Sequence, residues 1–221
     1  MRLYLDSADQ TQWQAWLPVG LFAGVTTNPT LLERARMICS IEQLQTLAHR
    51  SFDLGVKELH LQAWGGDIER LVRTGTALAA IDERVVVKLP ITHNGTSAAA
   101  QLIARGIRVT LTGVYTRHQA LIAAAVGANY AAPYLGRIDD LTNKGREELV
   151  AMQQALDGVG STTRLLVASI RSIDDMAFLA TQGLNAFTIS ADIATALFDV
   201  MATNESAATF EQAALGIRAE P

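Results

Sequence analysis

The sequence predicts a single (β/α)8 barrel, an α/β fold, and three observations favour it. A chain of 221 residues, 49% of them apolar and 18% charged, has the length and composition of one large α/β domain. Eight short apolar runs recur, each followed by a polar or glycine-bearing turn and a stretch with helical spacing. The runs are apolar on both faces, as in parallel strands covered by helices. A doubly wound open sheet is the alternative, but Asp6-Ser7-Ala8 stands where its glycine fingerprint usually follows the first strand.

The predicted elements alternate in chain order, and we expect residues 1–221 to form one domain. The apolar runs that predict strands are residues 3–5 (LYL), 24–26 (GVT), 59–61 (LHL), 85–89 (VVVKL), 109–111 (VTL), 130–132 (YAA), 165–168 (LLVA) and 186–189 (AFTI). Helical spacing predicts helices at residues 9–16, 68–81, 97–104, 117–126, 144–156 and 173–182. Several of these helices have a good N-cap residue at or near their start, namely Asp9, Asp67, Thr116 and Ser172.

An extra helical pattern follows the eighth predicted strand. Residues 205–218 carry apolar side chains at helical spacing although all eight βα units are already complete. We therefore expect an extra C-terminal helix, which packs either on its own barrel or on a neighbouring subunit.

The composition excludes several classes of partner. A net charge of −4 provides no basic surface for nucleic acid. The N-terminus enters a strand-like pattern directly instead of a signal peptide. The apolar stretch at 121–126 is far too short to cross a bilayer. The single cysteine allows no internal disulfide. We expect a soluble, cytoplasmic protein that binds a small molecule, with no nucleic-acid or membrane partner.

Polar residues gather where the predicted strands end. In (β/α)8 barrels the chemistry is built at the C-terminal ends of the strands. Seven of the eight predicted strands end in such residues, and these are Asp6, residues 26–28 (TTN), Gln62, Lys88, Thr112, Tyr134 and Ser169. The eighth strand runs into Ser190, which offers no obvious catalytic group. The pattern predicts an active site rather than a purely structural barrel.

Lys88 is the sharpest single feature of the sequence. It lies inside an apolar run, and the chain has only 3 lysines against 15 arginines. Lysine is almost never fully buried without a reason, and unlike arginine it can lose its proton and attack a carbonyl to form a Schiff base. The alternative is structural: Lys88 pairs with Asp6 or another carboxylate, or extends to the rim.

A second group of residues has the chemistry of an anion site. Arg137, Ser169 and Arg171 follow predicted strands six and seven, the region where barrels commonly hold phosphate, and the arginine fork suits that oxyanion. Surface ion pairs, for example of Arg137 with Asp139 or Asp140, are the alternative. In the same way the segment 24–30 (GVTTNPT) either binds hydroxyls or forms a capped turn.

The sequence shows no metal or cofactor motif. The four histidines, His49, His60, His93 and His118, have no Cys or Asp at ligand spacing, and neither a phosphate-binding loop nor a serine-nucleophile motif is present. We therefore expect no metal site and no cofactor.

Six short segments of the chain form a recognisable series, namely LDSA (5–8), GVTTNPT (24–30), VKLP (87–90), APY (132–134), GRID (136–139) and ASIR (168–171). In this order and spacing they are similar to segments of the short transaldolase family, which includes the fructose-6-phosphate aldolases. The resemblance runs from residue 2 to about residue 200. It implies a metal-independent class I barrel that forms a Schiff base with ketose phosphates. It also implies a homo-oligomer, since family members often form rings of five that pair into decamers, with the C-terminal helix reaching a neighbour.

Three positions separate the two activities of the family. Transaldolases carry a glutamate at the end of strand three, an asparagine two residues before the threonine that follows strand five, and a phenylalanine at the end of strand six. This chain has Gln62, Thr110 and Tyr134 there, and the aldolase branch resembles it in the glutamine, the tyrosine and the lack of the asparagine. A tyrosine hydroxyl adds a proton donor and acceptor beside the Schiff base, and a glutamine can orient water but cannot act as a base.

The resemblance thus implies reversible cleavage of fructose 6-phosphate to dihydroxyacetone and glyceraldehyde 3-phosphate. Lys88 would attack the C2 ketone, Asp6 would orient the 4-hydroxyl and take its proton, and Tyr134 would act through a water held by Gln62 and Thr112. The substrate would be held by Thr27 and Asn28 at the dihydroxyacetone hydroxyls and by Arg137, Ser169 and Arg171 at the phosphate. The nearest alternative is a transaldolase that transfers dihydroxyacetone to erythrose 4-phosphate. A third is a non-catalytic barrel that binds sugar phosphates.

Overall fold

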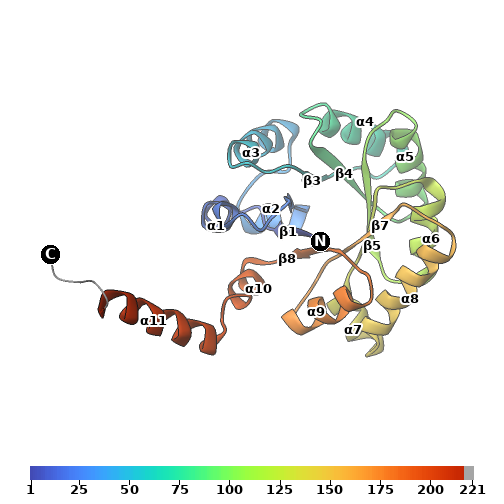
Figure 1. Ribbon diagram of the computed structural model, residues 1–221. Coiled ribbons are helices and arrows are strands. Elements are labelled where there is room, and N and C mark those ends of the chain that lie inside the picture. Colours follow the sequence, from blue (N-terminus) through green and yellow to red (C-terminus); the bar gives the residue numbers. More distant parts are fainter. Residues whose placement is uncertain (217–221) are drawn as a thin grey trace.

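The computed structural model describes residues 1–216 and confirms the predicted fold class (Figure 1). Eight parallel strands close into a barrel in chain order, with the last strand paired to the first. All eight predicted runs form strands. The strands are β1 (Arg2–Asp6), β2 (Gly24–Thr26), β3 (Leu59–Gln62), β4 (Val85–Pro90), β5 (Val109–Val114), β6 (Tyr130–Pro133), β7 (Arg164–Val167) and β8 (Ala186–Ile189).

Helices surround the strands on the outside of the barrel (Figure 1). The helices of the described chain are α1 (Gln10–Trp16), α2 (Pro29–Arg34), α3 (Ile41–Asp53), α4 (Ile68–Ala79), α5 (His93–Ile103), α6 (Arg117–Val126), α7 (Leu135–Thr142), α8 (Gly145–Gly158), α9 (Ile173–Thr181), α10 (Ala191–Ala196) and α11 (Met201–Gly216), with a 3-10 helix η1 (Leu17–Val19). Of these, α11 does not pack around the strands. The sequence reading predicted α1, α4, α5, α6, α8, α9 and α11. It did not predict α2, α3, α7 or α10.

Three of the four missed helices carry recognisable start signals, and one of these signals is Ser190, whose side chain accepts from Ile193 N and caps α10. The Ser40 side chain accepts a hydrogen bond from Gln43 N and caps α3. Asn28 caps α2 by accepting from Leu31 N, and Pro29 occupies the first turn. Proline at that position is typical of a helix start, although the same Asn-Pro pair also favours turns. The sequence analysis left segment 24–30 open between a binding segment and a capped turn and predicted no helix after it, whereas the structure has α2 there.

The helix α5 begins four residues earlier than predicted. The Thr92 side chain caps it by accepting from Gly95 N. A side chain at Gly95 would place its Cβ 1.9 Å from the carbonyl oxygen of Pro90, so the helix can approach β4 this closely only with glycine. In a sequence a glycine usually favours a turn, but Gly95 is required because α5 packs so closely on β4.

The C-terminal helix is present but begins at Met201, four residues before the predicted start. Positions 217 and 218 of the predicted range lie outside the described residues. Figure 1 shows α11 extending away from the barrel, and none of its residues is buried. Among residues 1–216 no helix combines the length and the apolar character needed to cross a membrane.

The end of the barrel opposite the strands' C-termini has a polar interior. Glu58, just before β3 and only 6% exposed, accepts hydrogen bonds from the hydroxyls of Tyr4 (2.7 Å) and Tyr130 (2.8 Å). His60 Nε2 lies 2.9 Å from the same carboxylate, and Arg108 donates to its other oxygen at 2.6 Å. Burial alone would raise the pKa of Glu58, but these donors hold the pKa of the carboxyl well below its usual range. Burial lowers the pKa of His60, so a neutral ring completes this network.

Candidate active site

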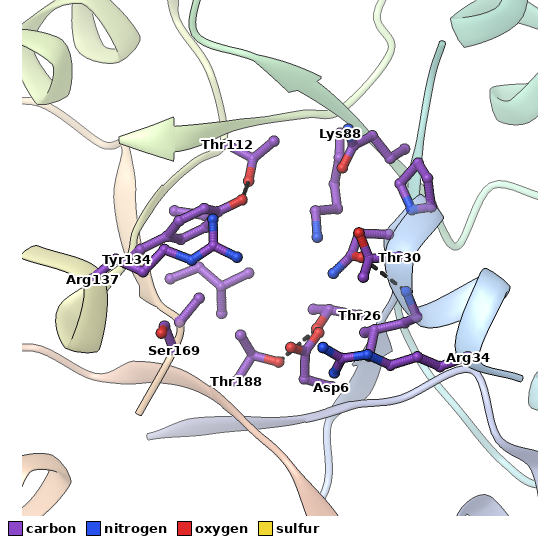
Figure 2. Close-up of a pocket in the computed structure, with 17 residues that line it drawn as sticks. Asp6, Thr26, Thr30, Arg34, Lys88, Thr112, Tyr134, Arg137, Ser169 and Thr188 are labelled. Carbon is purple, nitrogen blue, oxygen red and sulfur yellow. Dashed lines mark hydrogen bonds between the residues drawn. The ribbon is translucent and has the colours of Figure 1, made fainter. Parts of the chain in front are cut away.

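The C-terminal ends of the strands surround an open cavity of about 520 Å³ (Figure 2). This volume falls in the range of small-molecule sites. Eight of the ten predicted site residues line it, namely Asp6, Asn28, Gln62, Lys88, Thr112, Tyr134, Arg137 and Ser169. Thr27 and Arg171 do not. The barrel therefore brings residues from seven different strand ends to one place, as its closed parallel topology requires.

Lys88 lies inside the mouth of the barrel and its amino group points into the cavity (Figure 2). The residue is 6% exposed, and Nζ donates a hydrogen bond of 2.7 Å to the carbonyl oxygen of Thr27. Burial lowers the pKa of the Lys88 amine, and the carboxylate of Asp6 opposes that shift in part. Lys88 therefore neither extends to the rim nor forms an ion pair with a described carboxylate. The arrangement suits an amine that reacts in its neutral form.

Asp6 lies across the cavity from Lys88 (Figure 2). Its Oδ1 accepts a hydrogen bond of 2.6 Å from Thr26 Oγ1, which lies 2.6 Å from Thr188 Oγ1. The second oxygen of Asp6 makes no hydrogen bond within residues 1–216 and is left for a ligand. This short chain fixes the carboxylate so that it can hold a substrate hydroxyl near the lysine.

Tyr134 follows β6 and lies on the cavity wall. Its hydroxyl is 2.6 Å from Thr112 Oγ1. The Tyr134 and Tyr115 rings pack edge to face, with their centroids 5.6 Å apart. Gln62 is the neighbour of Lys88 in the register of β3 and β4. A hydroxyl pair and an amide thus lie on either side of the lysine, where they can position a water and pass a proton.

Arg137 and Ser169 form part of the cavity wall after β6 and β7. Arg137 lies over the Tyr134 ring, 5.1 Å from its centre, and its one hydrogen bond, to Tyr115 Oη, is long at 3.4 Å. Ser169 has a left-handed backbone with φ of 58°, and its carbonyl accepts from Gly136 N at 3.0 Å. A Cβ at Gly136 would lie 2.7 Å from that carbonyl, so glycine is needed here. The guanidinium is free to bind an anion.

Arg171 is differently placed. Its two terminal nitrogens each donate to Asp140 at 2.6 Å, forming a fork-shaped ion pair outside the cavity. The sequence reading raised Asp140 as an ion-pair partner, but for Arg137. The structure brings Arg137 and Ser169 into the cavity and leaves Arg171 beside it, engaged with a carboxylate.

Thr27 and Asn28 contribute to the site in different ways. Thr27 is buried, and both its N–H and its hydroxyl donate to the carbonyl of His60, at 3.0 and 3.3 Å. Thr27 therefore contributes to the site through its own carbonyl, which holds Lys88. Asn28 lines the cavity, and because its side-chain oxygen caps α2, its amide N–H groups are left for a ligand.

Apart from Thr26, which the sequence analysis named only as part of a strand end, three polar residues of the cavity were not predicted. Thr188 points inward from β8, two residues before Ser190, which the sequence reading took as that strand's end. The two-residue alternation of strands would have identified it. Thr30 and Arg34 were missed because α2 was not predicted, and their spacing of four places both on one face of that helix.

Within residues 1–216 no three His, Cys, Asp or Glu side chains are grouped as metal ligands.

The sequence is similar to known proteins over nearly its whole length. The family model described as transaldolase/fructose-6-phosphate aldolase matches residues 3–219. A protein named probable transaldolase from Chlorobium phaeobacteroides is 34% identical over 204 residues, which cover 91% of this chain and 87% of that protein. Another of the same name from Geobacter metallireducens is 32% identical over 209 residues, covering 91% of this chain and 88% of its own.

Two solved structures share the fold at low sequence identity. A thiamine phosphate pyrophosphorylase from Pyrococcus furiosus superposes with a TM-score of 0.57 and 16% identity over 86% of this chain and 85% of its own. A mandelate oxidase variant superposes with a TM-score of 0.60 and 19% identity over 86% of this chain and 64% of its own. These show the barrel architecture alone, whereas the family model and the relatives support an activity of the aldolase or transaldolase type. The chain belongs to the transaldolase/fructose-6-phosphate aldolase family.

Proposed function

We propose that the protein is a cytoplasmic class I aldolase that reversibly cleaves fructose 6-phosphate to dihydroxyacetone and glyceraldehyde 3-phosphate. The observation that carries the proposal is Lys88, a buried amine with a lowered pKa that faces Asp6 across a polar cavity. No metal or organic cofactor is needed, because an iminium formed by Lys88 itself accepts the electrons of the broken bond.

The reaction begins when the neutral amine of Lys88 attacks the C2 carbonyl. Loss of water from the carbinolamine leaves an iminium. Asp6 takes the proton of the 4-hydroxyl, the C3–C4 bond breaks, and its electron pair flows into the iminium to give an enamine and free glyceraldehyde 3-phosphate. Protonation of the enamine at C3 and addition of water to the resulting iminium then release dihydroxyacetone and restore the amine. Arg137 and Ser169 hold the phosphate, and Asn28 the donor hydroxyls.

Tyr134 supports cleavage over transfer. Its hydroxyl, hydrogen-bonded to Thr112, can deliver the proton to the enamine and assist imine hydrolysis, and Gln62, which lines the same cavity, can orient the attacking water. A phenylalanine at this place would supply no proton, so the enamine would persist until it reacts with an aldehyde acceptor.

A transaldolase is the second candidate, because the curated relatives are named probable transaldolases. A coupled assay separates the two by following release of glyceraldehyde 3-phosphate from fructose 6-phosphate, with and without erythrose 4-phosphate. Sustained release without acceptor is the expected result. Release only in the presence of erythrose 4-phosphate would make the protein a transaldolase, and ligand binding without turnover would favour a non-catalytic barrel.

We expect Tyr134→Phe to lower kcat for cleavage about 100-fold, the lower range for loss of one acid–base group. The measurement is steady-state release of glyceraldehyde 3-phosphate, together with transfer to erythrose 4-phosphate. Transfer should fall much less than cleavage. Tyr115→Phe is the matched control, because its hydroxyl contacts Arg137 and not the reacting atoms, so it should change KM more than kcat. Equal loss of both activities in Tyr134→Phe would remove the proposed role.

We also infer that the protein is a homo-oligomer, a pentamer or decamer, joined through α11. This helix exposes Phe210 (71%) and Leu215 (54%), and isolated helices of its length are marginally stable in water, so it needs a packing partner. Deleting residues 201–221 should reduce the mass measured by light scattering after size exclusion to that of a monomer. The pair Phe210→Asp and Leu215→Asp should do the same. A full-length chain that is already monomeric would contradict this inference.

A further inference from the structure

Thr188 is the residue of β8 that lines the cavity, and it is only 4% exposed. In the closed barrel β8 lies between β1, which ends at Asp6, and β7, which Ser169 follows. Figure 2 shows the same order on the cavity wall, with Thr188 between Asp6 and Ser169. A ligand that extends from Asp6 to Ser169 therefore passes the Thr188 side chain.

The hydrogen bonds around Thr188 have a single possible direction. A carboxylate only accepts, so Thr26 donates its one hydroxyl hydrogen to Asp6 Oδ1. In the 2.6 Å bond between the two threonine hydroxyls, Thr188 must then be the donor and Thr26 the acceptor. Within residues 1–216 the Thr188 hydroxyl makes no other hydrogen bond. Its hydrogen is therefore committed, and toward the cavity it can only accept.

This part of the cavity wall thus presents two hydrogen-bond acceptors joined through Thr26 (Figure 2). One is the second oxygen of Asp6, and the other is Thr188 Oγ1. Two such acceptors suit two neighbouring hydroxyl groups that each donate one hydrogen. A hydrogen, a fluorine or an ether oxygen in place of the second hydroxyl would leave the buried Thr188 oxygen without a donor, which costs affinity.

We infer that Thr188 accepts a hydrogen bond from the 5-hydroxyl of the ketose and selects for a hydroxyl next to the one that Asp6 holds. The inference rests on the proposed function for the position of the ligand, with C2 at Lys88, the 4-hydroxyl at Asp6 and the phosphate at Arg137 and Ser169. C5 joins C4 to C6, just as β8 lies between β1 and β7. Cleavage turns the 5-hydroxyl into the 2-hydroxyl of the released aldehyde. The site would therefore favour 2-hydroxyaldehydes and the ketoses made from them.

The first test measures binding without the reaction. Three hexitol 6-phosphates, which have no carbonyl and cannot form an imine, are compared by calorimetry on the full-length protein. They are the parent with its 5-hydroxyl, the 5-deoxy analogue and the 5-deoxy-5-fluoro analogue. We expect the parent to bind about 10-fold more tightly than either analogue, the scale of one buried acceptor left unpaired. The fluoro analogue should resemble the deoxy one, because fluorine cannot donate.

Three variants locate the contact. Thr188→Val lacks the acceptor and should bind the three hexitols about equally, whereas Thr188→Ser keeps the hydroxyl and should keep the preference. Thr163→Val is the matched control, because Thr163 is also buried but donates to the carbonyl of Ala128, at 2.8 Å, and does not line this cavity. It should keep the wild-type preference. The wild-type series and Thr188→Ser decide the question should Thr188→Val not fold.

The second test measures cleavage. The ratio of kcat/KM for fructose 6-phosphate to kcat/KM for 5-deoxyfructose 6-phosphate should fall about 10-fold in Thr188→Val. Comparing this ratio between the two proteins cancels the different intrinsic reactivities of the two ketoses.

Equal affinity of the wild-type protein for the parent and the deoxy hexitol would overturn the inference. A fluoro analogue that binds as tightly as the parent would also overturn it, and so would a preference that survives in Thr188→Val. Borohydride trapping of dihydroxyacetone on Lys88 tests the proposed function alone. Trapping without an affinity difference keeps the aldolase and rejects the role of Thr188. A Thr188-dependent affinity difference without trapping keeps that role and rejects the Schiff-base chemistry.

Discussion

Replacing Lys88 with methionine should abolish turnover and borohydride trapping together. Methionine keeps the approximate length of the side chain but has no amine, so no carbinolamine or iminium can form. Removal of a covalent nucleophile typically costs more than about 10⁴-fold in kcat. Two quantities are measured. The first is the release of glyceraldehyde 3-phosphate, and the second is the mass that the protein gains when it is treated with borohydride in the presence of dihydroxyacetone.

The chain offers matched controls for this variant. Lys57 and Lys144 are both exposed, and Lys57→Met and Lys144→Met should retain both turnover and the mass gain. Lys88→Met should also unfold at no lower temperature than the wild type, because it replaces a desolvated amine with an apolar group. Turnover by Lys88→Met, or a mass gain located on another lysine, would contradict the mechanism.

The pH dependence of trapping provides a second check on Lys88. An ordinary lysine has a pKa of about 10.4, and burial lowers that of Lys88. Since the neutral amine is the nucleophile, the trapping rate should rise with pH and level off at a pH below the ordinary lysine value. A rate that still rises through pH 10 would show that the amine is not desolvated in solution.

The sequence was sufficient for the barrel and for most of the site because both depend on local patterns. The run around Lys88 is apolar on both faces, which is typical of a buried parallel strand, and its lysine is conspicuous for that reason. Strand ends in such a barrel converge on one face, so listing the residue that ends each strand found Asp6, Gln62 and Tyr134 without any knowledge of distances.

What could not be predicted depends on contacts between distant segments. The ion pair that holds Arg171 joins residues 31 positions apart, and nothing local distinguishes that arginine from Arg137. Arg34 was missed because Asn28-Pro29 favours a turn as much as a helix start. Glu58 follows Lys57 and looks like a solvent-exposed loop residue, yet barrel closure buries it.

The Glu58 carboxylate lies among partners from three distant places in the chain and also contacts His60, two residues further on. Tyr4 and Tyr130 are 54 and 72 residues from Glu58, and Arg108 is 50 residues away. His60 connects Glu58 to Thr110 through its two ring nitrogens, both at 2.9 Å. Because Glu58 is an anion and His60 is neutral, Nε2–H donates to the carboxylate and the Thr110 hydroxyl donates to Nδ1. Every donor in the network depends on the charge of this one residue.

Glu58→Ala should therefore destabilise the fold by about 3–5 kcal/mol, the cost of removing one partner from a buried ionic network. The measurement is the urea midpoint of unfolding at constant m. Glu148→Ala, which breaks an exposed ion pair with Arg117, is the control and should shift the midpoint far less.

The folded pKa of Glu58 lies below its unfolded value of about 4.3. Its contribution is therefore complete above that pH and is lost as the pH falls toward the folded pKa. In that range the wild type should lose its advantage over Glu58→Ala. An advantage that does not depend on pH would show that Glu58 stabilises the barrel by packing and not as an anion.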